Sequence, residues 1–183
     1  MKEVINTNPG LVENDVDGVS CFLACSQMVF RTKTGIKVPS FQELGDIIGR
    51  KEGQYSWEYG MLAYMARNGF DVEFISTFNL ERLVKEKNSY MYEYFGEEAA
   101  DDQIKNSDMD QGIKGIEGFL SSKKKKIACR VPTKNDIVNL INEGFYIIPY
   151  INQRILQADP GYVAHTILVY GYSDRGVRVH NPG

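Results

Sequence analysis

The spacing of hydrophobic positions predicts helices in the first half of the chain. Apolar residues are nearly continuous from Ser20 to about Arg31, a pattern typical of a helix that is buried on most sides, with Ser20 as its N-cap. The segments PSFQELGDIIGR and SWEYGMLAYMARNGF each place apolar residues on one helical face, and the second stops at Gly69. Residues 79–131 hold two or three further amphipathic helical stretches, whereas the polar leader, residues 1–19, is expected to be mostly loop.

Alternating hydrophobic and polar positions predict strands, which gather towards the end of the chain. DVEFIS predicts one short strand, and after the capped helix expected in PTKNDIVNLINEG, FYIIPYI predicts another in which Pro149 favours an edge or a bulge. The segments YVAHTILVYGY and GVRVHNP alternate and are joined by SDRG, which predicts a β-hairpin. Early helices and late antiparallel strands predict an α+β fold, a helical lobe packed on a sheet. No low-complexity linker divides the chain, so we expect a single domain over residues 1–183.

Composition and charge narrow the classes of function. A chain of 183 residues that is 43% hydrophobic is long enough for one globular domain with its own core. Its net charge of −3 provides no electrostatic reason to expect nucleic acid or a membrane surface as a partner. No apolar stretch approaches the roughly 20 residues that span a bilayer, and the first residues are too polar for a signal peptide, so a cytoplasmic location is expected. Three cysteines, an odd number, indicate reduced thiols more than a disulfide framework.

The segment GVSCFLACSQMVF leaves three alternatives for Cys21: a core thiol, a metal ligand or a nucleophile. A buried free cysteine behaves as a small hydrophobic residue, which is how we interpret Cys25 and Cys129. A thiolate, in contrast, is stabilised by a helix N-terminus and by a nearby imidazolium, and it is then a nucleophile. A zinc site made of Cys21, Cys25 and His165 would lack the usual spacing of two residues between its cysteines. We therefore expect no metal and no cofactor.

The two histidines of the chain, His165 and His180, both lie in the predicted hairpin. If the hairpin folds about Ser173, Asn181 lies directly opposite His165, with Cβ atoms ~5 Å apart, and its amide oxygen can hold the imidazole. If the loop is residues 174–176 instead, Asn181 moves four residues along the strand, roughly 13 Å. Side chains alternate along a strand, so His180 points away from this pair and is expected to face solvent.

Three segments of the chain resemble the papain-like cysteine peptidases. SCFLACSQM is similar to the pattern Asp-Cys-Gly-x-Ala-x-x-x-Met of the double-glycine leader peptidases, which process bacteriocins, and of their stand-alone bacterial relatives. SWEYGMLAYMARNGFDVEF resembles their Trp-x-x-x-x-Leu-Ala segment, and YVAHTILVYGYSDRGVRVHNPG resembles their histidine strand followed by Gly-Tyr and Asp/Asn-Pro. The resemblance covers residues 16–76 and 132–183 and implies a papain-like fold, in which the nucleophile helix of an N-terminal helical lobe packs on a C-terminal antiparallel sheet.

The same resemblance implies a cysteine hydrolase of peptide or amide bonds. Cys21 would attack the acyl carbon, His165 would act as base and then as acid, Asn181 would orient the imidazole, and a thioester would be hydrolysed. A peptide or amide is then the substrate. Two alternatives remain: an amidase or acyltransferase that uses the same triad, and a peptide-binding module that kept the fold without catalysis.

Two positions depart from the family pattern. Phe22 stands where the family has a glycine after the nucleophile. The family's oxyanion hole combines the backbone N–H of the nucleophile, here Cys21, with an upstream glutamine, in whose place this chain has Asp15 preceded by Asn14. An ionised Asp15 would repel an oxyanion, so either Asn14 supplies the second donor or the hole is incomplete. Loss of one such donor lowers the rate by about 100- to 1000-fold.

Overall fold

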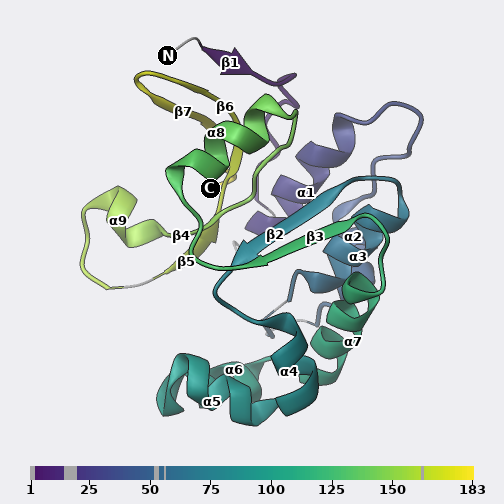
Figure 1. Cartoon of the computed structure of the whole chain (residues 1–183), viewed down its shortest axis with the longest axis vertical. Helices are drawn as coiled ribbons and strands as arrows, with labels where there is room; N and C mark the ends of the chain where they lie inside the picture. The colour runs from purple at the N-terminus through teal and green to yellow at the C-terminus, as the bar shows by residue number, and fades with distance from the viewer. Residues whose placement is uncertain (1–2, 15–19, 52–53, 56, 162) are drawn as a thin grey trace. The chain divides into compact units, whose positions relative to one another are not determined.

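The computed structural model in Figure 1 describes residues 3–14, 20–51, 54–55, 57–161 and 163–183. Among them it contains helices and short strands, as expected for a mixed α and β chain. The chain divides into two compact units, of which the first comprises Met1–Phe41 and Thr133–Gly183 and the second comprises Gln42–Pro132. One domain over residues 1–183 stays a prediction beside these two units.

Helices α1 (Cys21–Arg31) and α8 (Lys134–Asn142) of the first unit form where the sequence predicts them. Ser20 holds the N-cap position of α1, but its side chain makes no capping hydrogen bond. Helix α8 begins with a capping box, in which the Thr133 hydroxyl accepts from the Asp136 N–H and the Asp136 carboxylate accepts from the Thr133 N–H. The start of α8 is therefore fixed by a local cap, whereas the cap predicted for α1 does not form through the Ser20 side chain.

Two small antiparallel sheets complete the first unit (Figure 1). The leader supplies an edge strand that the sequence did not predict, so that one sheet has the order β1 (Val4–Ile5), β6 (Leu168–Ser173), β7 (Gly176–His180). The other sheet pairs β4 (Tyr150–Asn152) with β5 (Ala164–Thr166), and the short helix α9 (Gln153–Gln157) lies between these two strands in the chain.

Helix α8 packs against β1 and β6 over a small apolar core. The buried members of this core are Ile141, Val169 and Tyr172, and the hydroxyl of Tyr172 donates to Asn142 Oδ1 at 2.9 Å. Pro149 interrupts the strand predicted in FYIIPYI, which leaves only a bridge between Ile147 and Val169 before β4 begins. Because proline cannot donate to a ladder, the interruption agrees with the edge or bulge expected there.

The hairpin register differs from both registers expected from the sequence. Ser173 pairs with Gly176 across a two-residue turn, and a bulge between Val169 and Gly171 shifts the rest of the ladder, so that Leu168 pairs with His180. The equal-armed hairpin about Ser173 is therefore wrong, and so is the three-residue loop. The physical reason is first the two-residue turn, which sets the pairing of the strand ends, and then the bulge, whose extra residue in β6 shifts the remaining pairs by one.

Among its described residues, the second unit contains six helices and a parallel pair of strands. After α2 (Phe41–Ile48), α3 (Tyr59–Arg67) leads into β2 (Val72–Ser76), which runs parallel to β3 (Lys125–Cys129). A parallel pair requires a long crossover, and here four helices form it instead of the two or three predicted. These are α4 (Leu80–Glu86), α5 (Asn88–Phe95), α6 (Glu97–Asn106) and α7 (Met109–Leu120).

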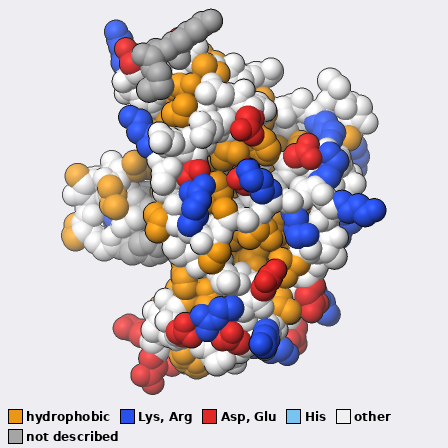
Figure 2. All heavy atoms as spheres, in the orientation of Figure 1, with side chains coloured by type: hydrophobic (Ala, Val, Ile, Leu, Met, Phe, Trp, Pro, Cys, Tyr) orange, Lys and Arg blue, Asp and Glu red, His pale blue; other side chains and the backbone are white. Residues whose placement is uncertain are grey.

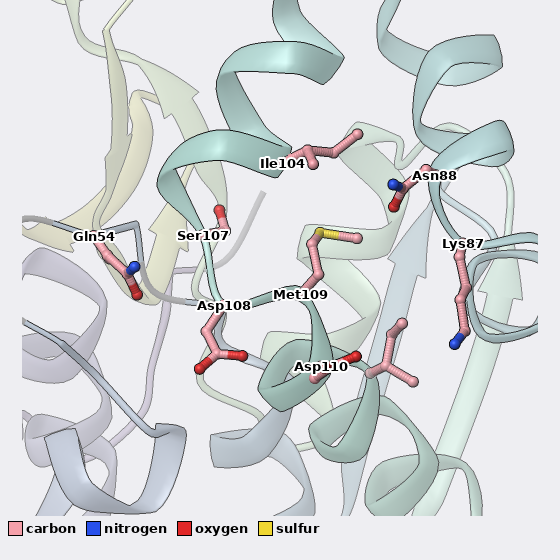
Figure 3. Close-up of a pocket in the computed structure, with 9 residues that line it drawn as sticks. Gln54, Lys87, Asn88, Ile104, Ser107, Asp108, Met109 and Asp110 are labelled. Carbon is pink, nitrogen blue, oxygen red and sulfur yellow. The ribbon is translucent and has the colours of Figure 1, made fainter.

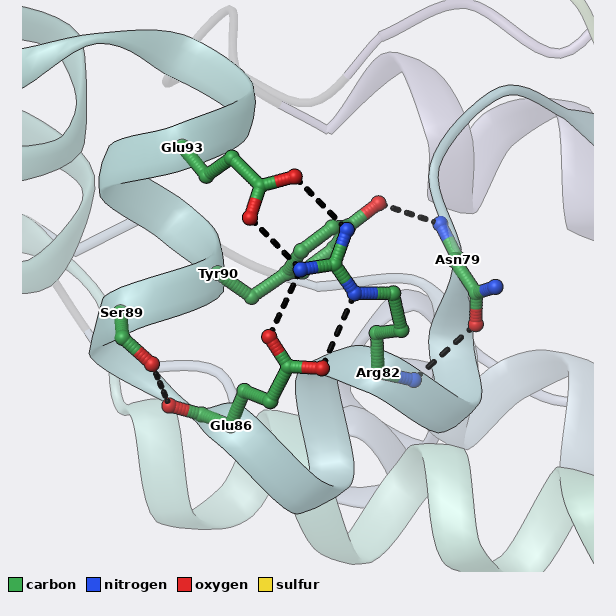
Figure 4. Close-up of polar contacts among 6 residues, drawn as sticks. All are labelled: Asn79, Arg82, Glu86, Ser89, Tyr90 and Glu93. Carbon is green, nitrogen blue, oxygen red and sulfur yellow. Dashed lines mark hydrogen bonds and ion pairs between the residues drawn. The ribbon is translucent and has the colours of Figure 1, made fainter.

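Helices α4 and α5 are joined by an ion-pair cluster around Arg82 (Figure 4). The guanidinium donates to both carboxylate oxygens of Glu86, at 2.9 and 2.7 Å, and to both of Glu93, at 2.7 and 2.6 Å. It also lies 4.6 Å from the centre of the Tyr90 ring, whose hydroxyl accepts from the Asn79 N–H. Hydrogen bonding to Arg82 lowers the pKa of both glutamates.

The surface of the second unit carries the acidic patch EEAADD on α6. Figure 2 shows acidic side chains gathered over α5 and α6. The carboxylates of the patch are exposed and belong to Glu97, Glu98, Asp101 and Asp102.

Among the helices of the described part of the chain, none combines the length and the apolar character that a membrane span requires.

Candidate active site in the first unit

The structure brings His165 and Asn181 into direct contact. His165 Nε2 lies 2.7 Å from Asn181 Oδ1, and the His165 side chain is buried, with 4% of its surface exposed. The Gly183 N–H donates to the same oxygen at 3.3 Å. A carboxamide oxygen only accepts hydrogen bonds, so Nε2 carries the proton in the neutral ring and Nδ1 keeps its lone pair. His165 is therefore held in the tautomer that can take a proton through Nδ1.

This contact forms even though the two residues are not opposite each other in a ladder. Ile167 separates β5, which carries His165, from β6, which pairs with β7. Asn181 follows His180, the last residue of β7. Side chains that are displaced by two residues across a strand pair lie about 7–8 Å apart at Cα, within reach of an imidazole and an amide. The sequence thus predicted the correct partners from an incorrect register.

Cys21 is the first residue of α1, as the sequence predicts. The first N–H groups of a helix have no acceptor within the helix, and together with the macrodipole they stabilise a negative charge placed there. The Cys21 side chain is partly exposed, so a substrate or a reagent can reach it. Helix α1 also packs against β5, the strand that carries His165. The helix that begins with Cys21 and the strand that carries His165 are thus neighbours within one unit.

Cys25 and Thr166 form the buried part of this contact between α1 and β5. Both residues have 0% of their surface exposed, and burial raises the pKa of the Cys25 thiol to about 12. The Thr166 hydroxyl lies near the Cys25 thiol and partly opposes this rise in pKa. Among the described residues, however, Thr166 Oγ1 has no hydrogen-bond partner at normal distance and angle. Cys25 is a core thiol, as predicted.

Cys129 does not fit the same prediction. It ends β3 in the second unit, its side chain is exposed, and its thiol donates to the Thr77 carbonyl at 3.7 Å. The prediction of a core thiol is therefore wrong here. The reason is that β3 has no fully buried residue, so neither face of this strand lies in a core.

The oxyanion candidates are described only in part. The Asn14 N–H donates to the Pro182 carbonyl at 2.8 Å, which places Asn14 beside the residue that follows Asn181. Asp15 lies outside the described residues. Phe22, the second residue of α1, is partly buried, and its carbonyl accepts from the Ser26 hydroxyl.

His180 is not the solvent-facing residue that strand alternation predicts. Its ring stacks on Tyr170 with centroids 4.7 Å apart, and its Nε2 lies 2.7 Å from Asn8 Oδ1. Burial lowers the pKa of His180. Sequence reasoning missed this contact because Asn8 lies in the leader, which was expected to be loop.

A separate cavity of about 490 Å³ lies within the second unit (Figure 3). Figure 3 shows Gln54 and Lys87 on opposite sides of it. Its other lining residues are Asn88, Ile104, Ser107, Asp108, Met109, Asp110 and Ile113. The predicted site residues that the structure describes, Asn14, Cys21, His165 and Asn181, belong to the first unit and do not line this cavity.

Neither a cluster of metal-binding residues among those described nor a similarity to a known protein supports this candidate site. No group of three or more His, Cys, Asp or Glu residues that could hold a metal ion comes together in the part of the chain that the structure describes. No family model, no curated protein and no solved structure matches the chain. The candidate site therefore rests on the geometry of its own residues.

Proposed function

We propose that this chain is a papain-like cysteine hydrolase of peptide or amide bonds, with Cys21, His165 and Asn181 as its catalytic residues. The observation that carries the proposal is the hydrogen bond of 2.7 Å between His165 Nε2 and Asn181 Oδ1. It leaves Nδ1 as the proton acceptor, which is what a cysteine nucleophile requires of its base. The packing of α1 on β5 supports the papain-like arrangement of a nucleophile helix against a histidine strand.

In the proposed reaction, His165 Nδ1 takes the proton of the Cys21 thiol and the thiolate attacks the carbonyl carbon of the substrate. The C–N bond then breaks, and the imidazolium gives its proton to the leaving amine. A water molecule attacks the thioester, its proton passes to Nδ1, and the C–S bond breaks to release the acid and restore the thiol. Asn181 stays neutral and stabilises the imidazolium with its amide dipole.

The oxyanion would be stabilised by the backbone N–H of Cys21 and by the Asn14 side-chain amide. A donor at a developing oxyanion is worth about 100- to 1000-fold in rate. Asn14 supports this role through its backbone contact to Pro182, next to Asn181. Asp15 would repel the oxyanion when ionised, so we assign it no donor role. A reducing, cytoplasmic compartment is part of the same proposal, because three free cysteines suit it.

The test is the pH dependence of alkylation by iodoacetamide in a Cys129→Ala background. That substitution removes the exposed thiol, while Cys25 is buried and its pKa is about 12, so Cys21 is the thiol left to react. We expect half-maximal alkylation well below the pH of about 8.5 that is typical of a free thiol. His165→Ala and Asn181→Ala should each move this midpoint up towards that value, and Cys21→Ala should abolish the fast reaction.

An unchanged midpoint near 8.5 in every variant would remove the catalytic proposal and favour the peptide-binding module. With a reactive Cys21, a screen of peptide and small amide substrates with and without hydroxylamine as an acceptor separates hydrolysis from acyl transfer. Thermal unfolding of each variant serves as the folding control.

A further inference from the structure

The triplet Asn-Pro-Gly occurs twice in the chain, starting at Asn8 and at Asn181. Each of the two histidines binds the asparagine of one triplet: His180 Nε2 lies 2.7 Å from Asn8 Oδ1, and His165 Nε2 lies 2.7 Å from Asn181 Oδ1. In both triplets the glycine N–H donates to the same asparagine oxygen, at 2.9 Å in the first and 3.3 Å in the second. Because His180 directly precedes Asn181, the first pair holds the backbone that carries the second.

The leader reaches this backbone from both sides of Asn181. On one side, Asn8 holds the ring of His180, and on the other the Asn14 N–H donates to the Pro182 carbonyl at 2.8 Å. Asn181 itself lies beyond the last ladder pair, Leu168 with His180, so sheet pairing does not fix its backbone. At this position, contacts from the leader therefore fix the backbone, as pairing with a neighbouring strand does within the sheet.

The leader also contacts the bulge in β6. The Asn6 N–H donates at 2.9 Å to the carbonyl of Tyr170. Tyr170 is the extra residue between Val169, which pairs with Val179, and Gly171, which pairs with Arg178. A side chain at Gly171 would place its Cβ 2.9 Å from the Val4 carbonyl oxygen, so β1 approaches β6 more closely than any other residue would allow. The Tyr170 ring in turn stacks on His180.

We propose that the described part of the leader, residues 3–14, positions Asn181 and, through Asn181, the ring of His165. Asn8 and His180 are the positioning residues. Neither residue is assigned a contact with Cys21 or the substrate. The inference rests on the proposed function for its catalytic consequence, but its structural consequence, the orientation of the His165 ring, can be measured by itself.

The test is the ¹⁵N NMR spectrum of the imidazoles in the full chain, which contains only two histidines. In the wild type we expect His165 as the single tautomer protonated at Nε2. In Asn8→Ala it should become a mixture of tautomers, and alkylation of Cys21 at pH 7 should slow by about tenfold as its thiolate fraction approaches the few per cent of an ordinary thiol. Asn8→Asp keeps an acceptor oxygen and should restore both properties to within about twofold.

Asn142→Ala is the matched control, because Asn142 Oδ1 also accepts one side-chain hydrogen bond in the first unit, from Tyr172, and among the described residues it has no hydrogen bond to the segment of Asn181. If Asn8→Ala unfolds the unit, His180→Phe replaces it as the test, since phenylalanine keeps the ring stack and removes the Nε2 donor. The proposal would be overturned if the His165 tautomer in both Asn8→Ala and His180→Phe is the same as in the Asn142→Ala control. If the His165 tautomer changes in Asn8→Ala but Cys21 is not reactive in the wild type, the positioning proposal holds and the proposed function fails. If Cys21 is reactive and Asn8→Ala changes neither the tautomer nor this reactivity, the proposed function holds and the positioning proposal fails.

Discussion

The contact between α3 and α7 provides the sharpest stability prediction for the second unit. The two helices meet through glycines, and a Cβ added to Gly115 would lie 2.6 Å from the Gly60 backbone nitrogen and 3.0 Å from its Cα. Both neighbours are backbone atoms, so a side-chain rotation cannot relieve the clash. Gly115→Ala must therefore push the helices apart.

The magnitude follows from two opposing terms. Alanine gains about 1 kcal/mol over glycine inside a helix, whereas overpacking of a core costs about 1–3 kcal/mol. A backbone clash lies at the upper end of that range, so we expect a net loss of about 1–2 kcal/mol. Gly118→Ala is the control in the same helix, because its Cβ would lie 3.4 Å from the Ala63 Cβ and meet no backbone atom. It should be neutral or stabilise by up to about 1 kcal/mol.

The assay is urea unfolding followed by tryptophan fluorescence. Trp57 is the single tryptophan of the chain and lies in the second unit, where its Nε1 donates to the Ser107 hydroxyl at 3.2 Å and its ring meets Tyr59 edge-on. Its signal therefore reports the unfolding of this unit. If Gly115→Ala proves as stable as Gly118→Ala, the close approach of the two helices is incorrect.

Two further predictions concern the first unit. Thr166→Val should raise the stability of this unit by about 1 kcal/mol, because among the described residues the buried Thr166 hydroxyl lies near the Cys25 thiol but makes no hydrogen bond of normal geometry, and an unsatisfied buried polar group costs about 1–3 kcal/mol. Calorimetry should show a rise in Tm of about 2–4 °C, and a lower Tm would mean that the contact with the thiol is a stabilising hydrogen bond. Burial lowers the pKa of His180 on folding, so the unfolded state binds the proton more readily. His180 therefore contributes stability that is present above the usual histidine pKa of about 6.5 and is lost as the pH falls below it. Wild type should therefore lose more stability than His180→Gln between pH 8 and pH 5 in urea titrations, and equal losses would contradict the burial of this ring.

The elements that the sequence predicted best are those with local causes. Helix α1 begins at Cys21 and α8 begins after its capping box at Thr133, because apolar spacing and cap residues act within a few positions. The pairing of His165 with Asn181 was predicted too, but from a register that does not form. The bulge at Tyr170 lies where the Asn6 N–H, from the other end of the chain, donates to the Tyr170 carbonyl, and a contact between such distant segments is not visible in a local pattern.

By itself, the sequence determined the positions of the main helices, the residues at the ends of the last hairpin, and the three types of side chain that suggest a cysteine nucleophile. Only the tertiary structure decided the register in which they meet. It placed the leader along β6 and the ring of His180 against Asn8, and it buried Cys25 while leaving Cys129 exposed. The physical reason is that helix starts depend on neighbours in sequence, whereas register, burial and the reach of one side chain to another depend on which distant segments pack together.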